Sequence, residues 1–203
     1  MTGNRSDLID NGVLVSAQAL SKNYGKFEAV KSIDFTIKKG EIFGLIGPDG
    51  AGKTSIFHIM GGVMNQSGGK IEILGKIPRQ ARPDIGYLTQ KFSLYLDLSI
   101  KENIRYSAAL RHVEREQFEI RSNELLELMD LKRFENRLAG NLSGGMKQKL
   151  ALCCSLISRP KLLLLDEPTT GVDPVSRRDF WDVLSTVALE GVTVAVATPY
   201  LDE

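Results

Sequence analysis

Cysteine and histidine are scarce in this sequence of 203 residues, which contains two of each. The cysteines, Cys153 and Cys154, are adjacent, and the histidines are His58 and His112. A disulfide framework and a Cys/His zinc site both need residues at set spacings, so these four residues can build neither. Such a composition favours the cytosol, and we expect the two cysteines to pack as small apolar residues in a helix.

Long apolar runs and an excess of one charge are also absent. No stretch approaches the roughly 18 consecutive apolar residues of a membrane-spanning helix, and residues 1–11 are too polar for a signal peptide. Lys and Arg number 26 against 25 Asp and Glu, which gives a net charge of +1. This balance argues against a nucleic-acid-binding arm, and 42% hydrophobic residues indicate an ordinary globular protein.

Predicted strands and helices alternate along the chain, which indicates an α/β fold. Alternating apolar residues at 13–20 and 29–37 predict two antiparallel strands. Short apolar runs at 41–46, 162–165 and 192–198 predict strands buried on both faces of a mostly parallel sheet, and two further short strands are predicted at 70–74 and 85–88. Capping signals and helical spacing predict helices over residues 53–61, 104–110, 114–131, 143–157 and 174–189.

These elements fit a single domain over residues 1–203, with a mainly helical lobe inserted at about 92–160. A turn-rich stretch with Gly75, Pro78 and Pro83 separates the two strands before that lobe. The last predicted strand ends five residues before Glu203, and no element follows to pack against it. We therefore expect the sequence to be a piece of a longer protein, truncated at its C-terminal side.

Residues 47–54 match the pattern G-x-x-x-x-G-K-[ST] between a predicted strand and a predicted helix. The glycines let backbone N–H groups wrap around phosphates, and the helix N-terminus adds a positive dipole end. Lys53 would bridge the β- and γ-phosphates, and Thr54 would hold Mg²⁺ through its hydroxyl. The predicted nucleotide-binding residues of this P-loop are Gly47, Asp49, Gly50, Ala51, Gly52, Lys53, Thr54 and Ser55.

Two carboxylates, Asp166 and Glu167, follow the predicted strand at 162–165. Ligands of an α/β sheet bind at this carboxyl edge, so Asp166 suits the Mg²⁺ shell, and Glu167 suits orienting or deprotonating an attacking water. Taken alone, an acidic pair after a strand is more often a helix cap or a solvated turn. The P-loop upstream favours the catalytic interpretation.

A second anion-binding helix start is predicted at Ser143, Gly144 and Gly145, 24 residues before Asp166 as counted from Leu142. One domain has no use for two γ-phosphate sites. With this motif in place, the sequence resembles the nucleotide-binding domain of ATP-binding cassette (ABC) proteins over nearly its whole length. In that family, this segment completes the ATP site of a partner cassette in a head-to-tail dimer.

The resemblance implies roles for three further residues. Tyr24 matches the aromatic residue that stacks on adenine, and Gln90 matches the glutamine that senses Mg²⁺ and the γ-phosphate. Asp173 ends the segment 170–173, which matches the D-loop. Each has a simpler alternative: Tyr24 as a hairpin aromatic, Gln90 as a surface polar residue, and Asp173 as a helix cap.

One departure from the family pattern concerns the γ-phosphate. Family members usually carry a histidine just after the last strand, where this sequence has Pro199. Proline has neither a side-chain donor nor a backbone N–H, so this residue cannot make the contact. Met146, where glutamine is commoner, is a milder departure.

The resemblance implies an ATPase that powers an ABC transporter, with ATP and Mg²⁺ as cofactors and a second nucleotide-binding domain as partner. An integral membrane permease would place the protein on the cytoplasmic face of the membrane. Its coupling helix would dock on an apolar cluster of Phe92, Leu94, Tyr95 and Leu96, which ordinary core packing also explains. The sequences of residues 92–104 and 169–178 are similar to those of exporter cassettes from drug and polysaccharide efflux systems.

Two alternative functions remain open at this stage. One is a soluble ABC protein of translation, which needs two cassettes in one chain; a DNA-repair protein is close to excluded because residues 53–143 carry no heptads. The other is a regulatory nucleotide-binding half that hydrolyses weakly, because Pro199 stands in the histidine position.

Overall fold

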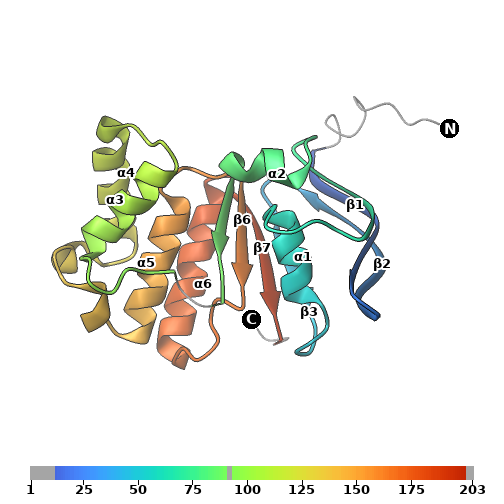
Figure 1. Ribbon diagram of the computed structural model, residues 1–203. Helices are drawn as coiled ribbons and strands as arrows, with labels where there is room; N and C mark the ends of the chain where they lie inside the picture. The colour runs from blue at the N-terminus through green and yellow to red at the C-terminus, as the bar shows by residue number, and fades with distance from the viewer. Residues whose placement is uncertain (1–11, 91–92, 200–203) are drawn as a thin grey trace.

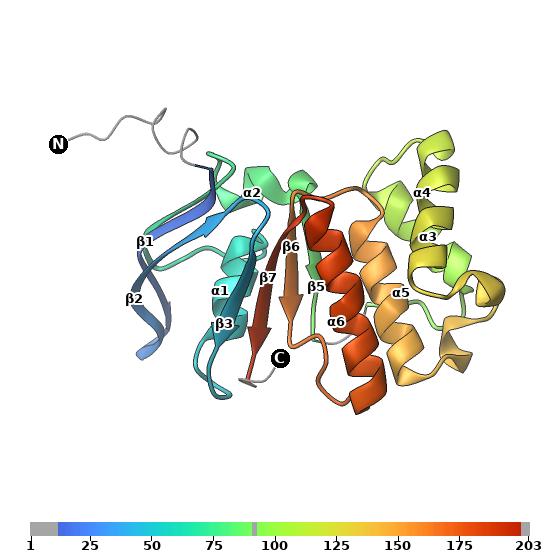
Figure 2. The ribbon, with the colours of Figure 1, turned by 180° about the vertical axis from the view of Figure 1, so that it is seen from behind.

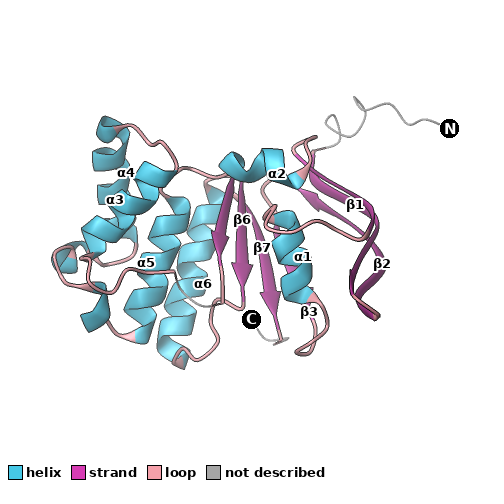
Figure 3. Cartoon of the chain, viewed as in Figure 1, coloured by secondary structure: helices cyan, strands magenta, loops and turns pink. Residues whose placement is uncertain are grey.

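A computed structural model describes residues 12–90 and 93–199, which form two β-sheets and the helices around them (Figures 1 and 3). The antiparallel sheet has the order β2-β1-β4, with β1 at Val13–Tyr24, β2 at Phe27–Lys38 and β4 at Gly68–Ile73. The second sheet is parallel, with the order β3-β7-β6-β5. Its strands are β3 at Ile42–Ile46, β7 at Thr193–Thr198, β6 at Leu162–Asp166 and β5 at Ile85–Leu88.

Helices cover both faces of the parallel sheet. Helix α1 (Lys53–Met60) lies between the two sheets, and helices α3 to α6 lie on the other side of the parallel sheet, as Figures 1 and 2 show. The four helices of that side are α3 (Ile100–Leu110), α4 (Arg115–Leu128), α5 (Gly144–Leu156) and α6 (Pro174–Leu189). The short elements are α2 (Pro78–Ala81) and 3₁₀ turns at Arg82–Asp84, Lys132–Phe134 and Ala139–Asn141.

Strand β6 shows how one run of leucines serves two cores. Leu163 and Leu165 pack into the core beneath the helical lobe, whereas Leu162 and Leu164 pack into the core that contains α1 and the antiparallel sheet. Successive side chains of a strand point to opposite faces, so a central strand with helices on both sides must be apolar throughout. The prediction of a fully buried strand is confirmed here, and β7 is likewise buried at every position.

The predicted helix starts are confirmed by their caps. Ser99 forms a capping box with Glu102, and the Ser143 side chain accepts a hydrogen bond from the Met146 N–H. Asp173 caps α6 by accepting from the Ser176 N–H, with a proline in the first turn as expected. Side-chain acceptors at these positions satisfy N–H groups that a helix start leaves unpaired.

The prediction that the strand at 41–46 is buried on both faces is wrong. Within residues 12–90 and 93–199, β3 pairs with β7 on one side only, and Ile42 and Ile46 are each 49% exposed. Phe43 and Leu45 face the core around α1. An apolar run indicates that a strand can be buried. Whether each of its faces is buried depends on which elements pack against it.

Two further differences concern local structure. The stretch predicted as turns contains the helix α2 and a 3₁₀ turn. Helix α2 begins after Ile77, with Pro78 at its first position. Phe92, at the predicted start of the helical lobe, and residues 200–203 lie outside the described residues.

No helix among residues 12–90 and 93–199 has the length and the apolar character needed to span a bilayer.

All four parallel strands end at the same edge of their sheet, the lower edge in Figure 1. The starts of α1, α5 and α6 lie on that same side (Figures 1 and 2). Strand ends and helix N-termini therefore share one edge, which is where an open α/β sheet binds ligands.

Candidate functional site

The loop between β3 and α1 is held close to neighbouring backbone. The Gly47 N–H donates to the Thr198 carbonyl at the end of β7, at 3.2 Å. Gly52 has φ of 87°, and a Cβ atom at this position would lie 2.3 Å from the Ala29 carbonyl oxygen. Gly50 also has a positive φ, of 80°. The loop thus needs glycine at Gly52 for both conformation and space, as a phosphate-wrapping loop does.

Lys53, the first residue of α1, is a nearly buried cation that is 5% exposed. Its Nζ donates to the carbonyl oxygens of Gly47 at 2.8 Å and Pro48 at 3.1 Å. It also lies 3.5 Å from Oε1 of Glu167 and 3.9 Å from Oδ1 of Asp49. Asp49 is 88% exposed, so its ion pair is screened and contributes little, and Glu167 is the main counter-charge.

Thr54 and Asp166 meet across the sheet edge, where the Thr54 hydroxyl donates to Oδ1 of Asp166 at 3.3 Å. Burial raises the pKa of Asp166 above its ordinary value, and the charge of Glu167 acts in the same direction. The hydrogen bond from Thr54 and the charges of His58 and Lys53 lower that pKa in part. A hydroxyl beside a buried carboxylate is a donor set that suits Mg²⁺, so these two residues fit the predicted metal site.

Glu167 joins three parts of the site. Its carboxylate accepts a hydrogen bond from Nε2 of Gln90 at 2.9 Å and pairs with Lys53. The Thr170 hydroxyl also lies 3.5 Å from Oε2 of Glu167. The predicted catalytic residues Gln90 and Glu167, which follow β5 and β6, are therefore in direct contact beside the P-loop.

Tyr24, at the end of β1, contacts α1, the helix that follows the P-loop. Its hydroxyl lies 3.1 Å from Oγ of Ser55 and donates to Sδ of Met64 at 3.2 Å. The ring is 46% exposed, and Nζ of Lys22 lies 5.3 Å from its centroid. An exposed aromatic face next to the P-loop helix is compatible with stacking on a planar ligand.

The second predicted anion-binding segment lies apart from the P-loop. Ser143 and Gly144 are exposed at the start of α5, which in Figures 1 and 2 stands across β6 from α1. A Cβ on Gly145 would lie 2.7 Å from Oγ of Ser176, so the starts of α5 and α6 pack closely. Asp173 is exposed at the start of α6, and its bond to the Ser176 N–H lowers its pKa.

Pro199 directly follows β7 and is half-buried. The preceding residue, Thr198, bonds through its carbonyl to Gly47, so the end of β7 lies against the P-loop. The position where the resemblance expects a histidine is thus at the site, but its side chain offers no polar atom.

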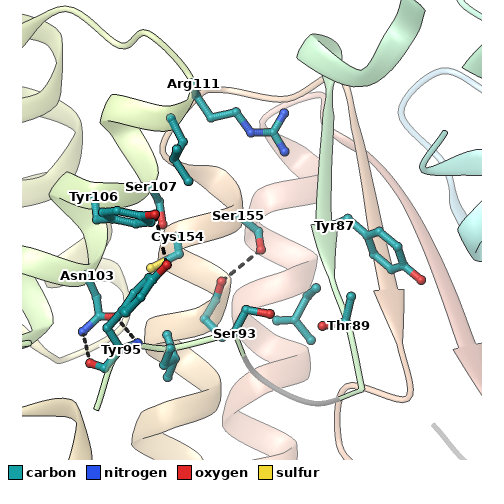
Figure 4. Close-up of a pocket in the computed structure, with 14 residues that line it drawn as sticks. Tyr87, Thr89, Ser93, Tyr95, Asn103, Tyr106, Ser107, Arg111, Cys154 and Ser155 are labelled. Atoms are coloured by element: carbon teal, nitrogen blue, oxygen red, sulfur yellow. Dashed lines mark hydrogen bonds between the residues drawn. The ribbon is translucent and has the colours of Figure 1, made fainter. Parts of the chain in front are cut away.

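A groove of about 310 Å³ lies between β5 and the lobe helices α3 and α5 (Figure 4). Tyr95 and Tyr106 line it, with ring centroids 4.6 Å apart and a hydrogen bond of 3.0 Å between their hydroxyls. Asn103 fixes this wall, because its amide donates to the carbonyls of Tyr95, Leu98 and Ser99. Of the predicted apolar cluster, Tyr95 and Leu94 line the groove, Leu96 is 53% exposed, and Phe92 lies outside the described residues.

Among the buried polar residues that the sequence motifs did not identify, Asn103 and Gln148 lie close to the proposed sites. Asn103 is 2% exposed, and Gln148 is completely buried and donates its amide to the Pro168 carbonyl, directly after Glu167. A signal was present, because each polar residue sits on an otherwise apolar helix face: Asn103 beside Ile100 and Ile104, and Gln148 with Ala151 and Leu152.

Comparison with known proteins places this chain in a family. A profile described as "ABC transporter" matches residues 30–170. The "Probable multidrug ABC transporter ATP-binding protein YbhF" of Escherichia coli is 42% identical over 199 residues, covering 95% of this chain and 34% of the relative. The "Nod factor export ATP-binding protein I" of Rhizobium leguminosarum is 37% identical over 195 residues, covering 94% of this chain and 63% of the relative. The chain therefore spans about a third to two thirds of the length of these relatives.

Solved structures share the fold. The structure named "Structure of ATP binding subunit of ABC transporter" has a TM-score of 0.81 at 29% identity, over 93% of this chain and 80% of the other. The cbiO1 protein of Clostridium perfringens, described as part of the ABC transporter complex cbiONQ, has a TM-score of 0.86 at 26% identity. That match covers 94% of this chain and 80% of the other. The P-loop fold with an antiparallel β subdomain and helices is confirmed.

Substituting alanine for Gly52 or Gly50 separates the two demands of the loop. Both substitutions place a side chain at positive φ, which costs about 1 kcal/mol or more, but only Gly52→Ala also meets the Ala29 carbonyl. Gly50→Ala has no atom within 4 Å of the new Cβ. We expect a clearly larger loss of unfolding free energy in urea for Gly52→Ala than for Gly50→Ala. Equal losses would mean that close approach to Ala29 does not constrain the loop.

Proposed function

Because the chain belongs to the ABC transporter family, we propose that it is the ATP-binding and ATP-hydrolysing cassette of a transporter of the exporter type. It would act on the cytoplasmic face of a membrane, beside a permease that crosses it. The observation that carries the proposal is the cluster of Lys53, Thr54, Asp166, Glu167 and Gln90 at one sheet edge.

Each part of the cluster suits one task in phosphoryl transfer. The P-loop N–H groups and Lys53 would bind the phosphates, and Tyr24 would stack on the adenine. Mg²⁺ held by Thr54, Asp166 and Gln90 would neutralise charge on the phosphates. Glu167 would orient and deprotonate the attacking water, because it is a carboxylate placed beside both the P-loop lysine and Gln90.

The contacts of Glu167 imply an order of events. In the described structure Lys53 pairs with Glu167 and with loop carbonyls. Phosphate oxygens would compete for the same ammonium group, and their greater charge favours them. Phosphate binding at Lys53 would therefore free the Glu167 carboxylate for water.

Lys53→Ala tests the nucleotide site directly. The substitution removes charge-assisted hydrogen bonds worth about 1.5–3 kcal/mol, so the dissociation constant for Mg-ATP should rise at least about tenfold. Isothermal titration calorimetry on the purified chain measures this. Lys39→Ala, in the exposed turn after β2, serves as the matched control and should leave affinity unchanged. Unchanged affinity in Lys53→Ala would overturn the assignment of the P-loop.

A second cassette is proposed as a partner. Ser143 and Gly144 are exposed at a helix N-terminus that no described contact joins to the P-loop of the same chain. Such a start favours an anionic ligand, and in a head-to-tail pair it would face the phosphates on the partner's P-loop. Each ATP site would then be made from two chains.

Complementation between two inactive variants tests the composite site. Lys53→Ala retains an intact Ser143, and Ser143→Ala retains an intact P-loop, so each paired with itself should have little ATPase activity. Their mixture should regain activity, because one of the two sites in a mixed pair is complete. We would measure phosphate release at several total concentrations. A mixture no more active than its components, or turnover in the parent that is first order in protein, would contradict a site shared between chains.

The groove between β5 and the lobe is proposed as the docking surface for the permease. It is lined by Tyr95, Tyr106 and Leu94, and its lining also includes Thr89, the residue before Gln90. Among the described residues that line the groove, Arg111 is the one that carries a charge, and it donates to the Arg82 carbonyl. A permease helix with an apolar face and a carboxylate at one end would match this surface.

The site of this chain is further proposed to hydrolyse slowly. Pro199 offers no polar contact near the γ-phosphate, and loss of one positioned donor in a dry site costs about 10²- to 10³-fold in rate. Binding would be little affected, because the P-loop and Mg²⁺ provide most of it. A regulatory half that binds nucleotide and hydrolyses weakly is therefore the second candidate function.

Pro199→His distinguishes a slow site from a competent one. If the histidine contact is what the site lacks, the variant should hydrolyse ATP at least about tenfold faster per site than the parent, with similar ATP affinity. Single-turnover phosphate release in the assembled protein measures this, with Glu167→Gln as the inactive reference. A histidine variant no faster than the parent, with Glu167→Gln inactive, would show that the parent site was already competent.

A further inference from the structure

Gln148 is a completely buried amide on the second turn of α5, and its surroundings are asymmetric. Its Nε2 donates to the carbonyl oxygen of Pro168 in the segment after β6. Its Oε1 is buried and has no hydrogen-bond partner among the described residues. An unpaired buried acceptor costs about 1–3 kcal/mol, so this side chain is not one that stability alone would favour.

The segment that Gln148 contacts has an unusual backbone. Glu167 has φ of 50° although it is not glycine, and it precedes a proline, where a residue favours extended conformations. Such a conformation costs about 1–3 kcal/mol and persists where the surroundings impose it. The Glu167 N–H donates to the Ala197 carbonyl at 2.8 Å, and the Thr170 N–H donates to the Glu167 carbonyl at 3.3 Å. The Pro168 carbonyl is the next acceptor along the chain, and it accepts its hydrogen bond from the Gln148 side chain.

We propose that Gln148 is a positioning residue for Glu167: it fixes the Pro168 peptide and thereby the direction of the Glu167 carboxylate. The inference rests on the proposed function, in which Glu167 orients and deprotonates water. It also gives α5 a double role, because Ser143 caps this helix, which packs against Ser176 through Gly145. The helix that presents Ser143 to a partner thus holds the base of its own chain.

Geometry explains why the effect should fall on rate and not on binding. Lys53 lies on the β3–α1 side of the sheet edge, where its ammonium group donates to the Gly47 and Pro48 carbonyls, whereas Gln148 donates to Pro168. Glu167 follows β6, and its carboxylate contacts Gln90 and Lys53. A shift of the Pro168 peptide would misdirect that carboxylate while the phosphate-binding loop stayed intact. Small misplacements of reacting groups lower the reaction rate by about 10²-fold.

The test compares Gln148→Met with Leu150→Met in the full-length protein assembled with its partners. Gln148→Met keeps the length of the side chain and removes the donor, together with the unpaired acceptor. Leu150 is equally buried on the same helix, so Leu150→Met is a matched core control. Gln148→Asn retains the amide on a side chain one methylene shorter and serves as a second variant if methionine prevents folding.

Two measurements give the expected result. In Gln148→Met, kcat for ATP should fall about 10- to 100-fold while the dissociation constant for Mg-ATP stays within about twofold. Hydrogen exchange at the amides of residues 167–172 should become at least about tenfold faster, with protection elsewhere in α5 unchanged. Leu150→Met should change neither quantity. Gln148→Asn should resemble Gln148→Met, because the shorter amide cannot reach the carbonyl.

Each remaining outcome overturns the inference. Unchanged kcat in Gln148→Met and Gln148→Asn would show that the contact does not position the base. Equal losses of kcat and ATP affinity, or faster exchange throughout α5, would show a structural role only. Failure of the proposed function is distinguishable, since a parent protein without ATP hydrolysis fails before any variant is compared, and the exchange measurement does not depend on turnover.

Discussion

The nearly buried ammonium group of Lys53 is the constraint on which the site depends. Removing a cation from water is costly unless anions and carbonyl dipoles surround it. Lys53 stands at the start of α1, whose other side is packed between two sheets through residues such as Ile56 and Phe57. The helix therefore fixes where the charge lies, and the loop carbonyls and Glu167 are arranged around that point.

This arrangement connects segments that are far apart in the sequence. Gly47 and Thr198 join the P-loop to the end of β7, and Lys53 joins it to the end of β6. Gln90 at the end of β5 completes the set by donating to Glu167. Four parallel strands bring their carboxyl ends to one edge of the sheet, so the groups that follow these strands can lie around a single charge.

Much of the fold could be predicted from sequence because its signals are local. The caps Ser99, Ser143 and Asp173 act within three residues of themselves, and each predicted helix start is found in the structure. The burial of β3 could not be predicted in the same way. Its apolar run is like that of β6, but cover on each face comes from neighbours that the run itself does not specify.

The site was predictable in its residue types and less so in its contacts. The motif patterns identify Lys53, Thr54, Asp166 and Glu167, and the structure brings these residues together. The contact of Gln148 with Pro168 joins two elements through one side chain and one carbonyl, and no short pattern encodes it. Only the polarity of a residue on an apolar helix face pointed to it.

Pro199 illustrates how the proposed roles in binding and in hydrolysis are divided between different segments. The groups suited to holding phosphates belong to the β3–α1 loop and to Lys53, which the core around α1 keeps in place. The groups suited to activating water belong to the ends of β5, β6 and β7, and each strand contributes one position: Gln90, Glu167 and Pro199. With proline after β7, the contacts of Lys53 with Gly47, Pro48 and Glu167 are all present. For that reason a proline after β7 is compatible with a complete P-loop, and we expect affinity and turnover to vary independently at this site.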